Sequence, residues 1–141
     1  MRLLLDTNII VDIISEREGY AESLQLLRYC ETKFAEGFVS VISIMDVMYI
    51  LRKHKPREAG RPSLREAMQI MLIILNTAVI QKSDISGAFT GDMDDYEDAV
   101  QANCAWRIGA DYIVTRNLQD FTASPVPAIS PRDALEMLSG N

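Results

Sequence analysis

The sequence predicts an α/β fold in which a mainly parallel sheet carries helices on both of its faces. Short, fully apolar runs alternate along the chain with segments that have apolar residues at helical spacing, and this alternation is typical of parallel sheets. Polar residues directly follow two of the apolar runs, as they do where a buried strand ends. Because 141 residues are enough to bury one core, we expect a single domain over residues 1–141.

The first half of the chain predicts two strands, each followed by helical segments. Gly37 is expected to end the second helix, and Ser43 to begin the third. The expected strands lie at 3–5 and 38–41, and the expected helices at 9–15, 21–34 and 43–53.

The second half begins with a basic, proline-containing loop at 55–62. Ser63 and Glu66 form a capping-box pattern at a helix start, and Asp95 is placed to cap a later helix that Gly109 ends. The expected helices cover 63–75, a short segment from 83, 95–108, and a C-terminal segment with Pro131 in its first turn. The expected strands lie at 78–80, 112–115 and 126–129.

The composition excludes several classes of protein. A formal net charge of −6 argues against a protein that holds nucleic acid with its whole surface, but it leaves room for a local basic patch. No stretch is long and apolar enough to span a membrane, and Asp6 and Asp12 interrupt the apolar start that a signal peptide would need. We therefore expect a cytoplasmic protein with no membrane partner, in which Cys30 and Cys104 pack in the core.

Asp6, Thr7 and Asn8 place three oxygen-bearing side chains directly after the first predicted strand. Such a cluster suits a hard cation, and ligands bind at the carboxyl ends of the strands in parallel sheets. Asp6 would also cap the following helix well, so a purely structural role stays open.

A second polar group follows the strand predicted at 112–115 and consists of Thr115, Asn117 and Asp120. Because the carboxyl ends of parallel strands share one edge of the sheet, we expect these residues beside Asp6. Asn117 could instead simply cap a turn.

Further carboxylates lie on predicted helices. Asp46 interrupts an apolar segment, where burial of an unpaired charge is costly, so we expect it either in a cleft or on a narrow solvent-exposed stripe. Five acids crowd the start of the helix at 95–108, namely Asp92, Asp94, Asp95, Glu97 and Asp98. Acids suit a helix N-terminus, but a divalent cation would relieve their repulsion, and Asp95 and Asp98 can face the same way.

Four segments of the chain resemble, in the same order, the motifs of PIN-domain proteins. They are Leu5–Asn8, Ser43–Arg52, Asp95–Ala99 with Ala102 and Ala105, and Gly109–Phe121. The chain is similar to bacterial single-domain PIN proteins, including the VapC-type toxins of toxin–antitoxin pairs. The resemblance implies a three-layer α/β/α sandwich and a Mg²⁺- or Mn²⁺-dependent endoribonuclease that cleaves single-stranded RNA.

The resemblance also implies roles for individual residues. The catalytic acids would be Asp6, Asp46, Asp98 and Asp120. The metal ligands would be Asp6, Asp98, Asn117 and Asp120, with Asp95, Thr7, Asn8 and Thr115 as additional candidates. Asp46 stands where the family usually has a longer Glu, and Asn117 stands where many members have an Asp. A catalytically degenerate PIN domain that binds RNA or a protein therefore stays open beside the active ribonuclease.

Basic residues are the candidates for binding RNA phosphates. The substrate-binding candidates are Arg52, Lys53, Lys55 and Arg116, and Arg57, Arg61 and Arg65 extend the same basic segment. A solvated surface explains this segment equally well. The one histidine, His54, is given no catalytic role, because metal-dependent phosphodiester hydrolysis needs no imidazole.

Two other classes of protein fit less well. A haloacid-dehalogenase-type phosphatase needs a second Asp where Asn8 stands, and a response-regulator receiver needs a Lys at a late strand end where Arg116 stands.

As protein partners we expect a second copy of the chain in a homodimer, or an antitoxin helix held in an apolar groove. This expectation is motivated by the apolar run at 70–75 and by Met45, Met48, Met68 and Met71. Packing in the core would explain these residues as well.

Overall fold

The computed structural model describes residues 1–17, 19–56 and 58–140. In these residues, five parallel strands form one sheet in the order β3-β2-β1-β4-β5. The strands are β1 (Arg2–Leu5), β2 (Glu36–Ser40), β3 (Asn76–Ala78), β4 (Tyr112–Val114) and β5 (Ala128–Ile129). The predicted α/β class and its parallel sheet are confirmed.

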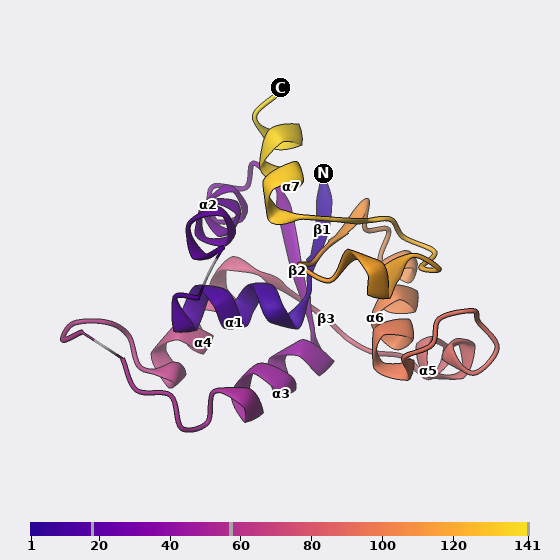
Figure 1. The fold of residues 1–141 in the computed structure, drawn as a ribbon, viewed down its shortest axis with the longest axis horizontal. Coiled ribbons are helices and arrows are strands. Elements are labelled where there is room, and N and C mark those ends of the chain that lie inside the picture. Colours follow the sequence, from indigo (N-terminus) through magenta and orange to yellow (C-terminus); the bar gives the residue numbers. More distant parts are fainter. Residues whose placement is uncertain (18, 57, 141) are drawn as a thin grey trace.

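Helices cover both faces of the sheet, which gives the three layers (Figure 1). They are α1 (Thr7–Ser15), α2 (Tyr20–Glu31), α3 (Val41–Ile50), α4 (Leu64–Ile74), α5 (Lys82–Ala88), α6 (Tyr96–Arg107) and α7 (Pro131–Leu138). The helices α1 to α4 and α7 lie on one side, while α5 and α6 lie on the other (Figure 1). A 3₁₀ turn, η1 (Leu118–Phe121), follows β4.

The central strand β1 is buried on both faces. Leu3 and Leu5 belong to the core under α1, α2, α4 and α7, whereas Leu4 belongs to the core under α6, because side chains alternate along a strand. A strand without a solvent-exposed face has to be apolar throughout. Since β1 pairs with β2 on one side and β4 on the other, Asp6 emerges between the carboxyl ends of two neighbouring strands.

The structure corrects the predicted role of Gly37. The helix expected to reach Phe34 ends at Glu31, and Gly37 lies inside β2 instead of ending a helix. A Cβ atom at Gly37 would lie 2.6 Å from both Cys30 Sγ and Leu75 Cδ2. Glycine is required there because α2 and the end of α4 pack directly on the strand.

The predicted bounds of one helix and one strand were also wrong by a few residues. The helix α3 begins at Val41 rather than Ser43, because the Ser40 hydroxyl accepts a hydrogen bond from the Ser43 N–H and caps the helix, and it ends at Ile50 rather than at 53. The third strand covers Asn76–Ala78 rather than 78–80, in register with Phe38–Ser40 of β2.

The predicted burial of both cysteines is confirmed. Cys30 and Cys104 are buried free thiols, and burial raises the pKa of Cys30 to about 11. Among the described residues, no helix combines the length and the apolar character that crossing a membrane requires.

A buried ion pair ties α5 to α6. The Asp84 carboxylate accepts hydrogen bonds from Arg107 Nε at 3.1 Å and Nη2 at 2.8 Å, and from the Gln81 N–H at 2.9 Å. Burial by itself raises the pKa of Asp84, but the hydrogen bonds from Arg107 and Gln81 outweigh burial and hold this pKa below its ordinary value.

Replacing Gly37 tests the close packing of α2 on β2. We expect Gly37→Ala to lower the free energy of unfolding by about 1–3 kcal/mol, because the added methyl group overpacks the core. Urea denaturation measures the change. In the Cys30→Ala background the loss should be smaller, since one of the two clashing atoms is absent. Gly91→Ala is the control, because a Cβ there meets nothing closer than 3.4 Å. Equal effects of Gly37→Ala and Gly91→Ala would contradict the packing argument.

Replacing Asp84 tests the ion pair between α5 and α6. We expect Asp84→Asn to lower the free energy of unfolding by about 2 kcal/mol near neutral pH. Because the folded pKa of Asp84 lies below the ordinary 3.8, its stabilisation is present above that value and is lost as the pH falls through the folded pKa. Urea titrations should show the two proteins converging below about pH 4. A difference that stays constant down to about pH 3 would exclude the ion pair as its cause.

Candidate active site

Asp6 directly follows β1 and begins α1. Its Oδ1 accepts a hydrogen bond from the Thr7 N–H at 2.8 Å, so the structural alternative, a helix cap, is present. The side chain is only 7% exposed, yet it also lines a hollow at the carboxyl edge of the sheet. Asp6 is therefore both a cap and part of the candidate site.

Four hydrogen-bond donors surround the Asp6 carboxylate. Besides the Thr7 N–H, Oδ1 accepts from Gln101 Nε2 at 3.2 Å. Oδ2 accepts from Thr115 Oγ1 at 2.8 Å and from Asn8 Nδ2 at 3.3 Å. Each carboxylate oxygen thus accepts two hydrogen bonds, and the predicted residues Thr7, Asn8 and Thr115 together with Gln101 fix the orientation of Asp6.

Gln101 was not predicted to belong to this site. It lies on α6, is 2% exposed, and donates through Nε2 to Ser43 Oγ at 3.0 Å, while Oε1 accepts from Ser40 Oγ at 2.5 Å. Ser43 Oγ in turn shares a hydrogen bond of 2.9 Å with Thr7 Oγ1. The sequence held one signal for this role of Gln101. Its amide lies one turn after Asp98 among alanines of the predicted helix, and a buried amide needs hydrogen-bond partners.

Three further acids line the same hollow, which has a volume of about 300 Å³. Asp46 comes from α3, and Glu97 and Asp98 come from the first turn of α6. The other lining residues are Thr7, Asn8, Val11, Arg17, Ile50, Arg116 and Asn117. The acidic hollow, as we call it, thus contains Asp6, Asp46 and Asp98 of the predicted set, and it adds Glu97.

The pKa values of Asp6, Glu97 and Asp98 are raised above their ordinary values. Burial is the main cause that raises the pKa of Asp6, and the charges of Asp120 and Asp46 add to it, while hydrogen bonds from Thr115 and Thr7 oppose the rise.

The first turn of α6 shows the largest effects. A hydrogen bond to Asp46, followed by burial and neighbouring charges, raises the pKa of Glu97 to about 7. Burial and the charges of Asp95, Asp6 and Asp120 raise the pKa of Asp98 to about 6. Carboxylates in this arrangement repel one another, and a bound cation would favour their charged forms.

Asp120 and Asp95 lie on the other side of Asp98. Together with Asp98 they line a smaller hollow of about 130 Å³. Asp95 Oδ1 accepts from the Asp98 N–H at 2.9 Å, so Asp95 caps α6. Asp120 is an exposed residue of η1 whose charge raises the pKa of both Asp6 and Asp98. The predicted acids therefore occupy two hollows that meet at Asp98.

The acids that line these two hollows offer hard oxygen atoms as metal ligands, and such ligands fit Mg²⁺ or Mn²⁺. Among the described residues, no group of three His, Cys, Asp or Glu side chains is placed to coordinate one ion together. An ion bound there would therefore have few protein ligands and would keep several waters, as Mg²⁺ commonly does.

The predicted basic residues divide into two groups. Arg116 lines the acidic hollow and forms an ion pair with the buried Asp12. Lys53 and Lys55 line an adjoining hollow of about 290 Å³, which shares Arg17 and Ile50 with the acidic one. We call this second space the basic hollow.

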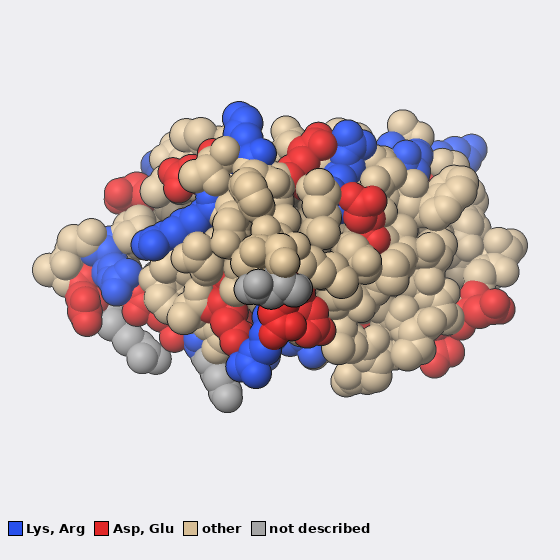
Figure 2. Space-filling view, turned by 90° about the horizontal axis from the view of Figure 1, so that it is seen from above, with Lys and Arg blue, Asp and Glu red and all other residues tan. Residues whose placement is uncertain are grey.

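The remaining basic residues point elsewhere or lie outside the described part. Arg52 donates to the Tyr49 carbonyl oxygen and lies over the Tyr49 ring, 4.1 Å from its centroid. Arg65 is exposed on α4, and Arg57 lies outside the described residues. Lys, Arg, Asp and Glu are interspersed on the face shown in Figure 2, with no single wide basic surface there.

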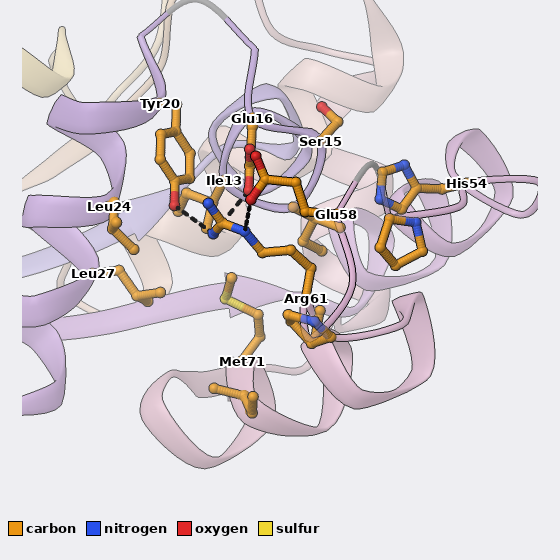
Figure 3. A pocket seen from close by; sticks show the side chains of 15 residues that line it. Ile13, Ser15, Glu16, Tyr20, Leu24, Leu27, His54, Glu58, Arg61 and Met71 are labelled. Atoms are coloured by element: carbon orange, nitrogen blue, oxygen red, sulfur yellow. Dashed lines mark hydrogen bonds and ion pairs between the residues drawn. The ribbon is translucent and has the colours of Figure 1, made fainter.

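Another pocket, of about 230 Å³, is mainly apolar, although Glu16 and Glu58 are among its lining residues (Figure 3). Its walls include Ile13 and Leu27 from α1 and α2 and Met71 from α4. Arg61 spans one side, within 3.5 Å of the Tyr20 hydroxyl and 2.9 Å of Glu16. None of the predicted acids lines this pocket, so it suits binding rather than the chemistry of the acidic hollow.

Comparison with known proteins gives a family and a fold. Residues 2–119 match the family described as PIN domain, whereas no curated protein matches the chain significantly. A chain of VapBC2 from Rickettsia felis, bound to a DNA fragment from their promoter, has a TM-score of 0.65 and 20% identity over 92% of this chain and 98% of that chain. A chain of FitAB bound to an IR36 DNA fragment has a TM-score of 0.64 and 20% identity, over 92% of this chain and 94% of that chain. PAE2754 from Pyrobaculum aerophilum has a TM-score of 0.67 and 10% identity, over 100% of this chain and 91% of that chain. At such identities the structural similarity shows the fold.

Replacing Gln101 tests the network around Asp6. We expect Gln101→Leu to lower the free energy of unfolding by about 2 kcal/mol, because Asp6 loses a donor and two buried serine hydroxyls each lose one of their hydrogen-bond partners. Gln25→Leu, on the exposed face of α2, is the control and should change stability by less than about 0.5 kcal/mol. Urea denaturation compares them. Equal stability of Gln101→Leu and the unmodified protein would show that the network contributes nothing.

Proposed function

This chain belongs to the PIN-domain family, and we propose that it is a Mg²⁺- or Mn²⁺-dependent endoribonuclease that cleaves single-stranded RNA. The observation that carries the proposal is the acidic hollow, in which the oriented carboxylate of Asp6 lies with Asp46, Glu97 and Asp98. Clustered acids with raised pKa values destabilise a fold, and such clusters are concentrated at functional sites.

We assign the metal ligands to the two hollows that meet at Asp98. Asp6 and Asp98 would bind the ion, with Asp120 and Asn117 on either side and Asp46 as the remaining catalytic acid. Bound Mg²⁺ or Mn²⁺ supplies an activated water and neutralises the charge on the leaving oxygen. Thr115 and Gln101 hold the Asp6 carboxylate in place through hydrogen bonds of 2.8 and 3.2 Å, so that ligand would be preorganised.

The basic hollow is the proposed path of the RNA backbone. It meets the acidic hollow at Arg17 and Ile50. A strand whose phosphates contact Lys53 and Lys55 would therefore pass the acids. Arg116 lines the acidic hollow itself and is the candidate for a phosphate next to the cleaved bond.

For partners, we propose an antitoxin protein and a second copy of this chain, with the protein acting as the toxin of a toxin–antitoxin pair. Two of the similar structures, VapBC2 and FitAB, are complexes bound to DNA. The apolar pocket between α1, α2 and α4 offers an antitoxin helix a place for apolar side chains.

Of the four methionines on which the expected protein partner was based, two lie in the core and two on the surface. Met68 and Met71 are buried in the core, whereas Met45 and Met48 are 58% and 38% exposed. With Val41 they form an exposed apolar stripe along α3, which is the surface we propose for the homodimer.

A degenerate PIN domain that binds RNA or protein is the second candidate. Asn117 lines the acidic hollow where many family members have an Asp, and Asp46 is one methylene shorter than the usual Glu. Fewer and shorter carboxylates hold a metal ion less well.

Neutralising either central acid tests the ribonuclease. We expect Asp6→Asn and Asp98→Asn each to reduce cleavage of single-stranded RNA in Mn²⁺ by about 100-fold or more, and EDTA to abolish it. Both variants should stay folded, because Asn can keep the cap that Asp6 provides to α1 and because Asp98→Asn lowers the like-charge repulsion. A panel of labelled oligoribonucleotides and thermal unfolding provide the measurements.

Asp133→Asn is the matched control, because Asp133 holds the same helical position in α7 as Asp98 in α6, with its N–H bonded to a capping residue. Its activity should equal that of the unmodified protein. Full activity of Asp6→Asn, or cleavage that resists EDTA, would reject the assignment.

Restoring the missing carboxylate separates the two candidate functions. We expect Asn117→Asp to tighten Mn²⁺ binding, measured by calorimetry, and to raise the cleavage rate, because it adds a charged ligand. No change in either quantity would show that Asn117 is only a turn residue. An inactive unmodified protein, combined with cleavage by Asn117→Asp with Asp46→Glu, would identify a degenerate domain. If neither protein cleaves any RNA, the ribonuclease proposal fails.

A further inference from the structure

We propose that Asp12 is a positioning residue that holds the Arg116 guanidinium at the rim of the acidic hollow, where its terminal nitrogens bind a phosphate of the RNA. This inference rests on the proposed function, because it names a residue that prepares the protein for its substrate. Asp12 was predicted only to interrupt the apolar N-terminus, and no role in a site was assigned to it.

Asp12 lies on α1 and is 0% exposed. Within the described part of the chain, neither of its carboxylate oxygens has a hydrogen-bond partner, and its charge is balanced mainly by Arg116, whose Nε lies 2.6 Å from Oδ2. Apolar residues that replace a buried ion pair often leave stability unchanged or raise it. Stability alone therefore does not account for an acid at this position.

Arg116 is well placed to contact a substrate. It directly follows Thr115, the strongest hydrogen-bond donor to Asp6, and its own N–H donates to Asn8 Oδ1 at 3.4 Å. Its side chain is 43% exposed and lines the acidic hollow. The ion pair with Asp12 is made through Nε, which leaves the two terminal nitrogens as the donors for a substrate.

The geometry of a guanidinium explains why Asp12 pairs with Nε. The group is a rigid planar fork of five N–H donors. When Nε is held by a buried acid, the two terminal nitrogens are left to bind a phosphate through paired hydrogen bonds. Asp12 thereby anchors the Arg116 side chain through its charge, while the terminal nitrogens stay available.

The charges on this side of the hollow also favour an anion. Arg17 lines the hollow as well, and its charge, like that of Arg116, acts on Asp12. Two arginines and one buried aspartate leave one net positive charge in the hollow that Asp46, Glu97 and Asp98 also line. A phosphate bound at Arg116 would therefore lie in the hollow that contains the acids.

The decisive variant is Asp12→Asn, because an effect of charge and an effect of Arg116 positioning would change the affinity for RNA in opposite directions. Loss of a negative charge near the RNA should tighten binding if charge alone matters. If Asp12 positions Arg116, binding should weaken by about tenfold. We expect the weakening, measured by fluorescence anisotropy of a labelled single-stranded oligoribonucleotide in EDTA. In cleavage assays KM should rise by a similar factor while kcat changes by less than about threefold.

Two further variants exclude a general structural effect. Arg116→Lys keeps the charge but loses the fork, so it should weaken binding as much as Asp12→Asn, and the double variant should be no weaker than either single one. Glu36→Gln, which breaks the exposed ion pair with Arg2 at the opposite edge of the sheet, should bind RNA normally. Thermal unfolding confirms that each variant is folded.

The outcomes separate this inference from the proposed function. Unchanged or tighter binding by folded Asp12→Asn overturns the positioning role, as do independent, additive effects of the two single variants. If the unmodified protein binds the oligoribonucleotide but cleaves nothing, the ribonuclease proposal fails and the binding comparison still decides the role of Asp12. A protein that neither binds nor cleaves RNA overturns both.

Discussion

A carboxylate buried at the end of the central strand has to be surrounded by hydrogen-bond donors, and much of this structure follows from meeting that requirement. Without them, burying the charge of Asp6 would cost several kcal/mol. The donors Thr7 and Asn8 come from α1, Thr115 follows β4, and Gln101 comes from α6 on the other face of the sheet. One side chain thus connects the central strand to both helical layers.

The same packing concentrates negative charge. Asp46, Glu97 and Asp98 are brought to Asp6 by α3 and α6. A hydrogen bond to Asp46 is the main cause that raises the pKa of Glu97, burial is the main cause that raises the pKa of Asp98, and neighbouring charges add to both. Among the described residues that line the hollow, the cations are Arg17 and Arg116, and Arg116 is paired with a buried acid. A metal ion and a phosphodiester together would neutralise this mixture of acids and arginines.

The helix α1 links the acidic hollow to the apolar pocket. Its first residues line the acidic hollow, whereas Ile13 and Ile14 near its end line the pocket between α1, α2 and α4. Asp12 lies between these two surfaces on the same helix. A partner that fills the pocket would therefore contact the helix that holds both Asp6 and the anchor of Arg116. The apolar pocket and the acidic hollow are therefore linked through α1 although their lining residues differ.

The sequence by itself determined the α/β class, most of the elements, and the resemblance to the PIN family. It could do so because apolar periodicity, helix caps such as Asp95, and polar residues at strand ends are local signals. Only the tertiary structure decided three other features. Gln101 and Glu97 lie in the site of Asp6, the absence of a side chain at Gly37 lets α2 pack closely on β2, and Asp12 forms an ion pair with Arg116. Each of those roles depends on a contact between segments far apart in the chain, so no local pattern specifies it.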